Sequence, residues 1–315
     1  MTLNVVLIKL VRAFITIWIV ASFAFVILSL TGDPVEILAG DDAPLEVQRY
    51  YEQKYGFDKP VWEQYLNYLG SLARGDFGIS LSDETPALDL VLEAIPATLQ
   101  LGFAALVFAL VVGSTLGTLA ALHRNSWLDR AIMSVAVFGY SIPNFFFGIV
   151  LILVFAMVYR LLPSSGSGTW AHLVLPTVTL GTHLAATIAR FMRSSVLEVL
   201  NQPYVRAAKA KGVPDLQRLA RHILPNAAIP VVTILGFRLG DIVAGSIIVE
   251  TVFAWPGMGR MLVGAVTSRD LAVVQAILVL TAFTMVLANL LVDFLYGFLD
   301  PRVAEASDAR RRAGR

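Results

Sequence analysis

The sequence predicts an all-α protein of the membrane, a bundle of six transmembrane helices. Hydrophobic residues make up 57% of the chain and charged residues only 15%, whereas soluble domains carry about 25% charged residues. The mean hydropathy is +0.72. Apolar runs long enough to cross a bilayer, which takes about 20 residues, recur along the chain. They are centred on residues 5–30, 98–122, 132–159, 173–197, 227–249 and 273–298.

Basic residues orient these helices, because cytoplasmic segments are enriched in Lys and Arg. Lys9 and Arg12 place the start of the first helix in the cytoplasm, and Arg302 with the run 310–312 places the C-terminus there too. The first apolar run exceeds the roughly 7–15 residues of a signal-peptide core. We therefore expect residues 1–30 to be an uncleaved transmembrane helix and residues 301–315 a cytoplasmic basic tail.

Residues 31–97 form a long polar segment that is rich in acidic residues and poor in Lys and Arg, so we expect it on the outer side. Two stretches, 45–55 and 60–72, have helical character. Aromatic residues concentrate there: Tyr50, Tyr51, Tyr55, Trp62, Tyr65 and Tyr68. They indicate either an interfacial anchor or, as we favour for so long a connection, a lid or docking surface over a pore mouth.

The sequence lacks the motifs typical of metal binding, thiol chemistry and ATP hydrolysis. The chain has no cysteine, and its four histidines, His123, His172, His183 and His222, are scattered without metal-ligand spacing. No phosphate-binding motif of the form G-x-x-x-x-G-K-[ST] occurs. We therefore expect no metal site, no ATP hydrolysis by this chain and, because the basic residues are orientation signals, no nucleic-acid partner.

A few polar or helix-breaking residues fall inside the apolar runs of the remaining core, residues 98–300. Pro143 predicts a bend in the third run, and Arg190 and Arg193 lie near the cytoplasmic end of the fourth, where they can snorkel. Arg238 and Asp241 share a helix face in the fifth run. Such residues form either a packing ion pair or a polar wall of a pathway, and Asp293 in the last run is ambiguous in the same way.

The cytoplasmic loop 201–225 has the most distinctive pattern. Pro203 suits the first turn of a helix, Ala207 and Ala208 favour helix, and Gly212 is typical of a left-handed helix end. Val213-Pro214-Asp215 then starts a second short helix, and Leu224-Pro225 marks the next boundary. Arg206, Lys209 and Lys211 could meet an acidic or polar surface. The pattern alone fits a docking element or an ordinary basic loop equally well.

On the outer side, the segment 250–260 reads Glu-Thr-Val-Phe-Ala-Trp-Pro-Gly-Met-Gly-Arg. Its proline and glycines predict a turned-in element, which we call the scoop segment. The residues expected to form the scoop and its docking surface are Phe253, Trp255, Pro256, Gly257 and Gly259.

These features resemble the permease subunits of binding-protein-dependent ABC importers. That family carries a loop of the form E-A-A-x-x-x-G-x9-I-x-L-P, which Ala207, Ala208, Gly212, Leu224 and Pro225 match. Arg206 replaces the Glu and His222 the Ile, so any role of that Glu does not apply here. The chain is most similar to the B-type permeases of the dipeptide, oligopeptide and nickel branch. The supporting segments are Gly32-Asp33-Pro34, Gly75-Asp76-Phe77-Gly78, Tyr204–Gly212, Val252-Phe253 with Pro256–Gly259, and Asp300-Pro301-Arg302.

The resemblance implies a bacterial cell-membrane protein that forms a heterodimer with a second, similar permease. It also implies two cytoplasmic ATPase subunits, which hold ATP and Mg, and an extracytoplasmic substrate-binding protein. The residues implied to couple to an ATPase are Tyr204, Val205, Arg206, Ala207, Ala208, Lys209, Lys211 and Gly212, with Leu224 and Pro225 as framework. Segment 31–97 and the scoop segment would meet the binding protein.

The predicted function is therefore translocation of di- or oligopeptides by alternating access, driven by partner ATPases. The same architecture dedicated to nickel or glutathione is one alternative. An ion-coupled secondary transporter is another, for which Arg238 and Asp241 are the only hint and no internal repeat is present. An intramembrane enzyme would need a nucleophile–base pair or metal ligands inside a span, and the sequence shows neither.

Overall fold

A computed structural model describes residues 3–30, 43–56, 58–80, 82–239 and 241–299. Within these ranges the side chains of residues 3–6, 28–30, 55, 233–244, 288–289 and 291–299 are not described. Three predictions therefore fall outside the described parts: the Gly32–Pro34 motif, the basic tail, and the contacts of the Arg238, Asp241 and Asp293 side chains.

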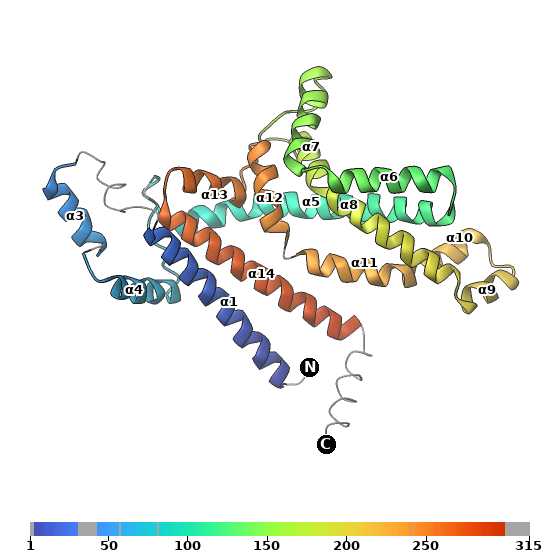
Figure 1. Cartoon of the computed structure of the whole chain (residues 1–315), viewed down its shortest axis with the longest axis horizontal. Coiled ribbons are helices and arrows are strands. Elements are labelled where there is room, and N and C mark those ends of the chain that lie inside the picture. The colour runs from blue at the N-terminus through green and yellow to red at the C-terminus, as the bar shows by residue number, and fades with distance from the viewer. Residues whose placement is uncertain (1–2, 31–42, 57, 81, 240, 300–315) are drawn as a thin grey trace. The chain divides into compact units, whose positions relative to one another are not determined.

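The described residues form helices, and no strand occurs among them, in agreement with the all-α prediction (Figure 1). The helices are α1 (Leu3–Leu30), α3 (Leu45–Tyr55), α4 (Val61–Ala73), α5 (Ala87–Leu122), α6 (Trp127–Ser141), α7 (Asn144–Leu151), the π-helix η1 (Ile152–Val158), α8 (Trp170–Leu200), α9 (Pro203–Ala210), α10 (Asp215–Arg218), the π-helix η2 (Leu219–Ile223), α11 (Leu224–Leu239), α12 (Asp241–Val252), α13 (Met258–Thr267) and α14 (Leu271–Leu299).

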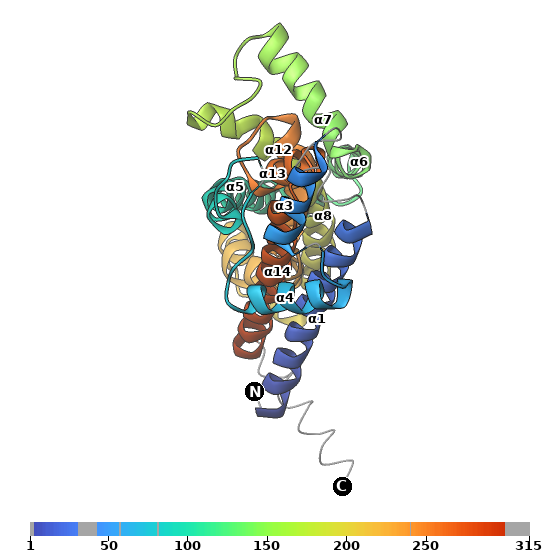
Figure 2. The same cartoon turned by 90° about the vertical axis from the view of Figure 1, so that its left-hand side faces the viewer.

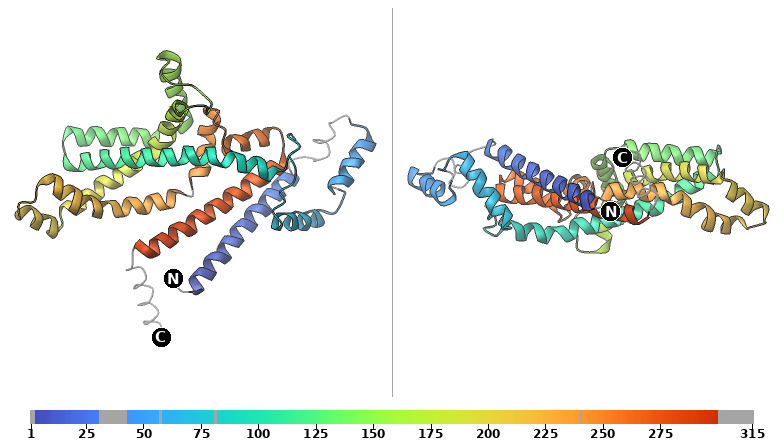
Figure 3. Two further views of the ribbon diagram at one scale, coloured as in Figure 1. Left: turned by 180° about the vertical axis from the view of Figure 1, so that it is seen from behind. Right: turned by 90° about the horizontal axis from the view of Figure 1, so that it is seen from below.

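The chain divides into two compact units, residues 1–95 with 261–315, and residues 96–260. In the first unit α1 and α14 lie side by side (Figure 1, Figure 3). The predicted outer helices at 45–55 and 60–72 are present as α3 and α4, which Figure 2 shows from the side. Two tyrosines of α4, Tyr65 and Tyr68, pack on Phe25 of α1, with ring centroids 5.3 and 5.5 Å away.

The connection between α4 and α5 is fastened to the start of α14. The hydroxyl of Ser80 donates to Asp270 Oδ2 at 2.5 Å, and both side chains are buried, at 1% and 2% exposure. Asp270 Oδ1 also accepts from the backbone N–H of Val273, so the same carboxylate caps α14. This anchors the C-terminal end of the outer segment within the first unit.

In the second unit α5 and α8 approach closely through small residues, as transmembrane helices often do. A Cβ placed on Gly117 would lie 2.4 Å from the carbonyl oxygen of Ala189, and one on Gly113 would lie 2.6 Å from that of Ala185. On the α8 side, a Cβ on Gly181 would meet Phe108 at 2.6 Å. Glycine is therefore required at these three positions for the two backbones to touch.

The predicted bend at Pro143 is confirmed. Helix α6 ends at Ser141, α7 begins at Asn144, and the two axes differ by 106°. Pro143 stands at the N-cap of α7, where its lack of an N–H is harmless. The third apolar run is therefore a broken pair of helices rather than one straight span.

By length and apolarity, three helices in the described part of the chain can cross a membrane, or four if the bent pair counts as one span. The three are residues 7–27 of α1, α5 and α8. The fifth apolar run, expected as a single helix over 227–249, is helical in α11 and α12, and residue 240 lies outside the described residues. The count of six spans stays a prediction.

Candidate functional site

Helix α9, in the loop 201–225, has one buried and one open face. Val205 and Ala208, three residues apart, are 4% and 8% exposed. Val205 belongs to a core cluster with residues of α8, η2 and α11, namely Ile188, Met192, Val196, Val199, Ile223, Ala227 and Val231. Tyr204, Arg206, Ala207, Lys209 and Lys211 are exposed. Val205 and Ala208 therefore hold α9 in place, and its other residues are available to a partner.

Gly212 ends α9 as the sequence predicted. Its φ is +76°, a conformation that glycine adopts without strain. The N–H of Val213 donates to the Ala208 carbonyl at 3.1 Å, and that of Gly212 donates to the Lys209 carbonyl at 3.0 Å. These two bonds are a Schellman motif, which satisfies the last carbonyls of the helix and fixes the direction of the corner.

The return helix is braced against this corner. Arg218 donates to the Val213 carbonyl at 3.3 Å and pairs with Asp215 at 2.5 Å. The position at which the resemblance calls for Ile holds His222, which is half-buried, while its neighbour Ile223 is 2% exposed. The π-helix η2 spans both residues. Ile223 thus supplies the buried apolar side chain of this turn, and α11 begins with Leu224 and Pro225.

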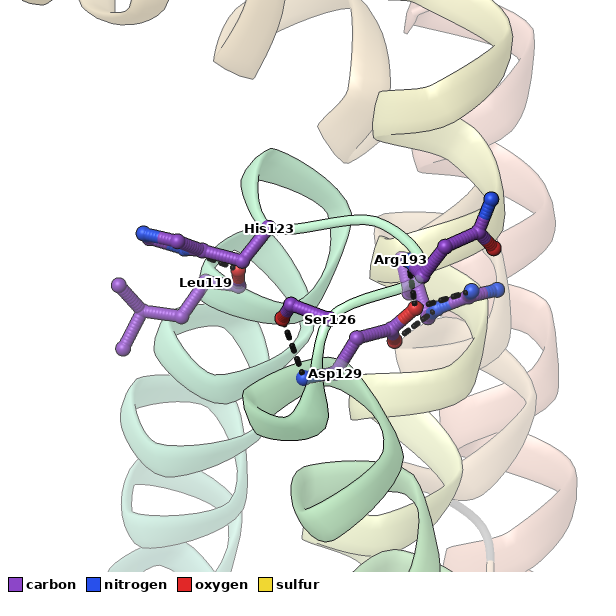
Figure 4. Close-up of polar contacts among 6 residues, drawn as sticks. Leu119, His123, Ser126, Asp129 and Arg193 are labelled. Carbon is purple, nitrogen blue, oxygen red and sulfur yellow. Dashed lines mark hydrogen bonds and ion pairs between the residues drawn. The ribbon is translucent and has the colours of Figure 1, made fainter.

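An ion pair that the sequence reasoning missed joins α6 to α8 (Figure 4). Arg193 donates from Nε and Nη2 to the two carboxylate oxygens of Asp129, each at 2.7 Å. Asp129 is 3% exposed and also accepts from the N–H of Asn125 at 3.0 Å. Ser126 caps α6 by accepting from the N–H of Asp129. Arg193 is therefore paired and does not snorkel.

The sequence did carry a signal for this pair. Asp129 is the only acidic residue between Glu93 and Glu198. A lone carboxylate between two apolar runs needs a buried cationic partner, and Arg190 and Arg193 were the nearest basic residues on the next run.

The scoop segment is held by a buried carboxylate, that of Glu250, which is 0% exposed. It accepts hydrogen bonds from the hydroxyls of Thr98 and Ser246 at 2.8 Å and from the N–H of Gly259 at 2.7 Å and of Arg260 at 3.1 Å. Because α13 begins at Met258, the carboxylate lies at the positive end of that helix.

Two glycines of the scoop segment make room for this arrangement. A Cβ on Gly257 would lie 2.4 Å from the carboxyl carbon of Glu250, and one on Gly259 would lie 2.5 Å from Cα of Ile247. The scoop segment forms a tight turn between α12 and α13, and its glycines allow close approach to Glu250 and Ile247 of α12. Its turned-in position on the outer side stays a prediction.

The two aromatic residues of the scoop segment are core residues. Phe253 and Trp255 are 1% and 2% exposed, and Trp255 donates from Nε1 to the carbonyl of Ala97 at 2.8 Å. Their side chains pack with Leu101, Leu151, Leu175 and Val249. Of the five predicted docking residues, only Pro256 is exposed. Docking of a binding protein on the scoop segment stays a prediction. Phe253 and Trp255 anchor the segment to the hydrophobic core.

No group of three or more His, Asp or Glu side chains that could hold a metal ion occurs among the residues described. The described geometry is that of a scaffold with an ordered corner after α9 and an ordered turn between α12 and α13.

Residues 113–305 match the family of binding-protein-dependent transport system inner membrane components. The chain is also 40% identical to the glutathione transport system permease protein GsiC of Escherichia coli K12 and of Shigella dysenteriae serotype 1, over 96% of this chain and 99% of those proteins. The chain belongs to this family. It is therefore a permease subunit of an ABC importer and a multi-pass protein of the bacterial inner membrane.

Solved structures support the fold of this permease. The inward-facing MetNI methionine ABC transporter aligns with a TM-score of 0.52 at 22% identity, covering 67% of this chain and 94% of that one. An amino acid ABC transporter with histidines aligns with a TM-score of 0.50 at 17% identity, covering 68% of this chain and 94% of that one. Permeases of this kind work with ATPase subunits and a substrate-binding protein.

Proposed function

We propose that this permease is one half of the translocation pathway of a peptide importer, paired with a second homologous permease in a heterodimer. Two ATPases holding ATP and Mg would move it between inward- and outward-facing states, and a binding protein would deliver di- or oligopeptides. In this proposal six spans cross the membrane and both termini are cytoplasmic. The 40% identity to permeases named for glutathione transport supports glutathione, itself a peptide, as a second candidate substrate.

The observation that supports the proposal is the structure of α9, which has a buried face packed on the core and an exposed basic face. A short helix is fixed to the core by Val205 and Ala208 and closed by a rigid glycine corner, while its exposed face carries Tyr204 and three basic residues. An element that transmits force needs a rigid attachment on one side and an accessible surface on the other. The basic face suits an acidic or polar cleft in an ATPase.

Gly212 provides the test of coupling. A Cβ at this position meets nothing within 4 Å, so a substitution there perturbs only the left-handed backbone. Valine is a strong outlier at positive φ, whereas asparagine tolerates it. We expect Gly212→Val to lower the amount of peptide imported per ATP hydrolysed, and Gly212→Asn to stay close to wild type.

The measurement uses the whole assembly in proteoliposomes, with uptake of short peptides and glutathione and ATP hydrolysis recorded together. Transport by Gly212→Val that equals wild type would rule out the coupling role of the corner. Uptake by the wild-type chain without ATP or ATPase subunits would instead favour the ion-coupled secondary transporter.

A further inference from the structure

Polar residues recur on one face of the C-terminal two-thirds of α8 and at its C-cap, a pattern we call the polar stripe. The residues follow one another at intervals of three or four positions, which places them on one helix face. They are His183, Thr187, Arg190, Ser194, Glu198 and Asn201. Arg190, Ser194, Glu198 and Asn201 are exposed.

A lipid-facing helix has the opposite character, and α5 shows the contrast. Its exposed positions include Leu99 at 49%, Phe103 at 67%, Val107 at 43% and Val111 at 59%. Hydrocarbon does not solvate an arginine or a glutamate. The exposed residues of the stripe, Arg190, Ser194, Glu198 and Asn201, therefore suit water or another polar surface, whereas these positions of α5 suit lipid or an apolar partner.

Arg190 is the charged residue of the stripe whose guanidinium contacts an aromatic ring rather than a carboxylate. Its guanidinium lies 4.8 Å from the ring centroid of Tyr140 on α6, and that ring stacks on His183 at 4.3 Å. Among the described residues no carboxylate lies within ion-pair distance of Arg190, although Arg193, one turn further on, is paired with Asp129. Arg190 therefore has an aromatic support and, among the residues whose side chains are described, no counter-ion.

The depth of this guanidinium follows from the two contacts between α6 and α8. The Asp129–Arg193 pair lies at the inner end, beside the basic loop of His123 and Arg124. Tyr140 is eleven residues further along α6, or about 16 Å at 1.5 Å per residue. Side chains on α8 lean toward its N-terminus, so Arg190 reaches toward Tyr140 and away from the Asp129–Arg193 pair. In the predicted topology this direction leads from the cytoplasmic end into the bilayer.

We propose that Arg190, supported by Tyr140 and flanked by His183, binds the carboxylate of the substrate as it crosses the membrane. This rests on the proposed function, because a peptide or glutathione always brings a C-terminal carboxylate. The planar guanidinium suits a carboxylate in a two-pronged hydrogen-bonded pair, and the stacked ring keeps its orientation. The open stripe lets the anion approach from the pathway.

The experiment compares substrates with and without that carboxylate. The complete assembly is reconstituted with the wild-type chain, Arg190→Gln, Arg190→Lys or the control Arg130→Gln, which removes an exposed cation from the inner end of α6. The probe pairs are trialanine with its C-terminal amide, and glutathione with its glycine ethyl ester. Each is presented at a concentration that saturates the binding protein, as measured separately by calorimetry.

We expect Arg190→Gln to lower uptake of the free acid about tenfold, the scale of a lost charge-assisted hydrogen bond, and to leave the blocked analogue little changed. Arg190→Lys should fall between the two, and Arg130→Gln should keep the wild-type ratio of acid to blocked uptake. An unchanged ratio in Arg190→Gln overturns the inference. A wild-type assembly that takes up none of the four probes overturns the proposed function itself, and the inference with it.

Two other anions could meet Arg190, and each has its own outcome. If the Arg190→Gln effect vanishes in liposomes without phosphatidylglycerol, a lipid phosphate is the ligand. If the variant lowers recovery of the paired permeases on co-purification, a carboxylate of the second subunit is the ligand. Either result overturns the assignment to substrate.

Discussion

At the scale of single residues, two tyrosines of α4 show how burial and hydrogen bonding decide what a hydroxyl group contributes to stability. Tyr65 and Tyr68 both pack on Phe25. The Tyr65 hydroxyl shares a 2.6 Å hydrogen bond with Ser22, whereas that of Tyr68 is buried without a partner among the described residues. Burial raises the pKa of Tyr68 to about 12, because the charged phenolate is poorly solvated there.

Removing each hydroxyl should therefore have a different effect on stability. Tyr65→Phe loses a partnered group and should lower the free energy of unfolding by about 1 kcal/mol. Tyr68→Phe removes an unpaired buried group and should be neutral or stabilising by a similar amount. Thermal unfolding of the purified protein in detergent measures both, and a loss in Tyr68→Phe as large as in Tyr65→Phe would contradict the burial argument.

The raised pKa of Tyr68 also has a pH signature. A group whose folded pKa exceeds its unfolded value contributes stability below the unfolded pKa and loses it as pH rises. The window here runs from about 10, the model-compound pKa of tyrosine, to the folded value of about 12. Wild type should lose more stability than Tyr68→Phe across that window, as followed by unfolding at each pH.

The Asp129–Arg193 pair is the other residue-scale feature. Breaking one partner of a largely buried pair leaves an uncompensated charge, which costs about 3–5 kcal/mol. We expect Asp129→Ala to lower the melting temperature sharply and the double variant Asp129→Ala with Arg193→Met to recover part of the loss. The double-variant cycle measures the coupling. Additive losses from the two single changes would mean that the pair contributes little.

At the scale of helices, much of the architecture could be predicted because apolar runs and helix caps are local signals. The outer helices, the bend at Pro143 and the glycine corner at Gly212 all depend on residues within a few positions. The burial of Phe253 and Trp255 could not be predicted, since it depends on Leu101, Leu151 and Leu175 from distant helices.

The contact of α5 with α8 gives the element-scale prediction. Gly117→Ala places a methyl carbon 2.4 Å from the Ala189 carbonyl oxygen, a backbone atom that cannot turn aside. Overpacking of this kind costs about 1–3 kcal/mol. The matched control is Gly70→Ala in α4, where a Cβ meets nothing within 4 Å and alanine favours helix. We expect Gly117→Ala to lower the melting temperature and Gly70→Ala to maintain or raise it; equal effects would refute the close approach.

At the scale of the whole molecule, the sequence predicts a basic loop on the cytoplasmic side of the membrane and an acidic helical segment on the outer side. The basic corner belongs to residues 96–260, whereas α3 and α4 belong to the unit that contains α1 and α14.

The outer helices α3 and α4 give the last prediction, which tests whether they dock the binding protein. Residues 43–73 would be replaced with a short Gly/Ser linker, leaving 74–86 intact because Ser80 is fastened to Asp270. We expect ATP hydrolysis stimulated by the binding protein to fall toward its basal rate, while membrane insertion is retained. Since this deletion also uncovers Phe25, the double variant Tyr50→Ala with Trp62→Ala is needed; those side chains are 58% and 65% exposed. Stimulation that survives in both correctly inserted variants would leave interfacial anchoring as the role of these aromatic residues.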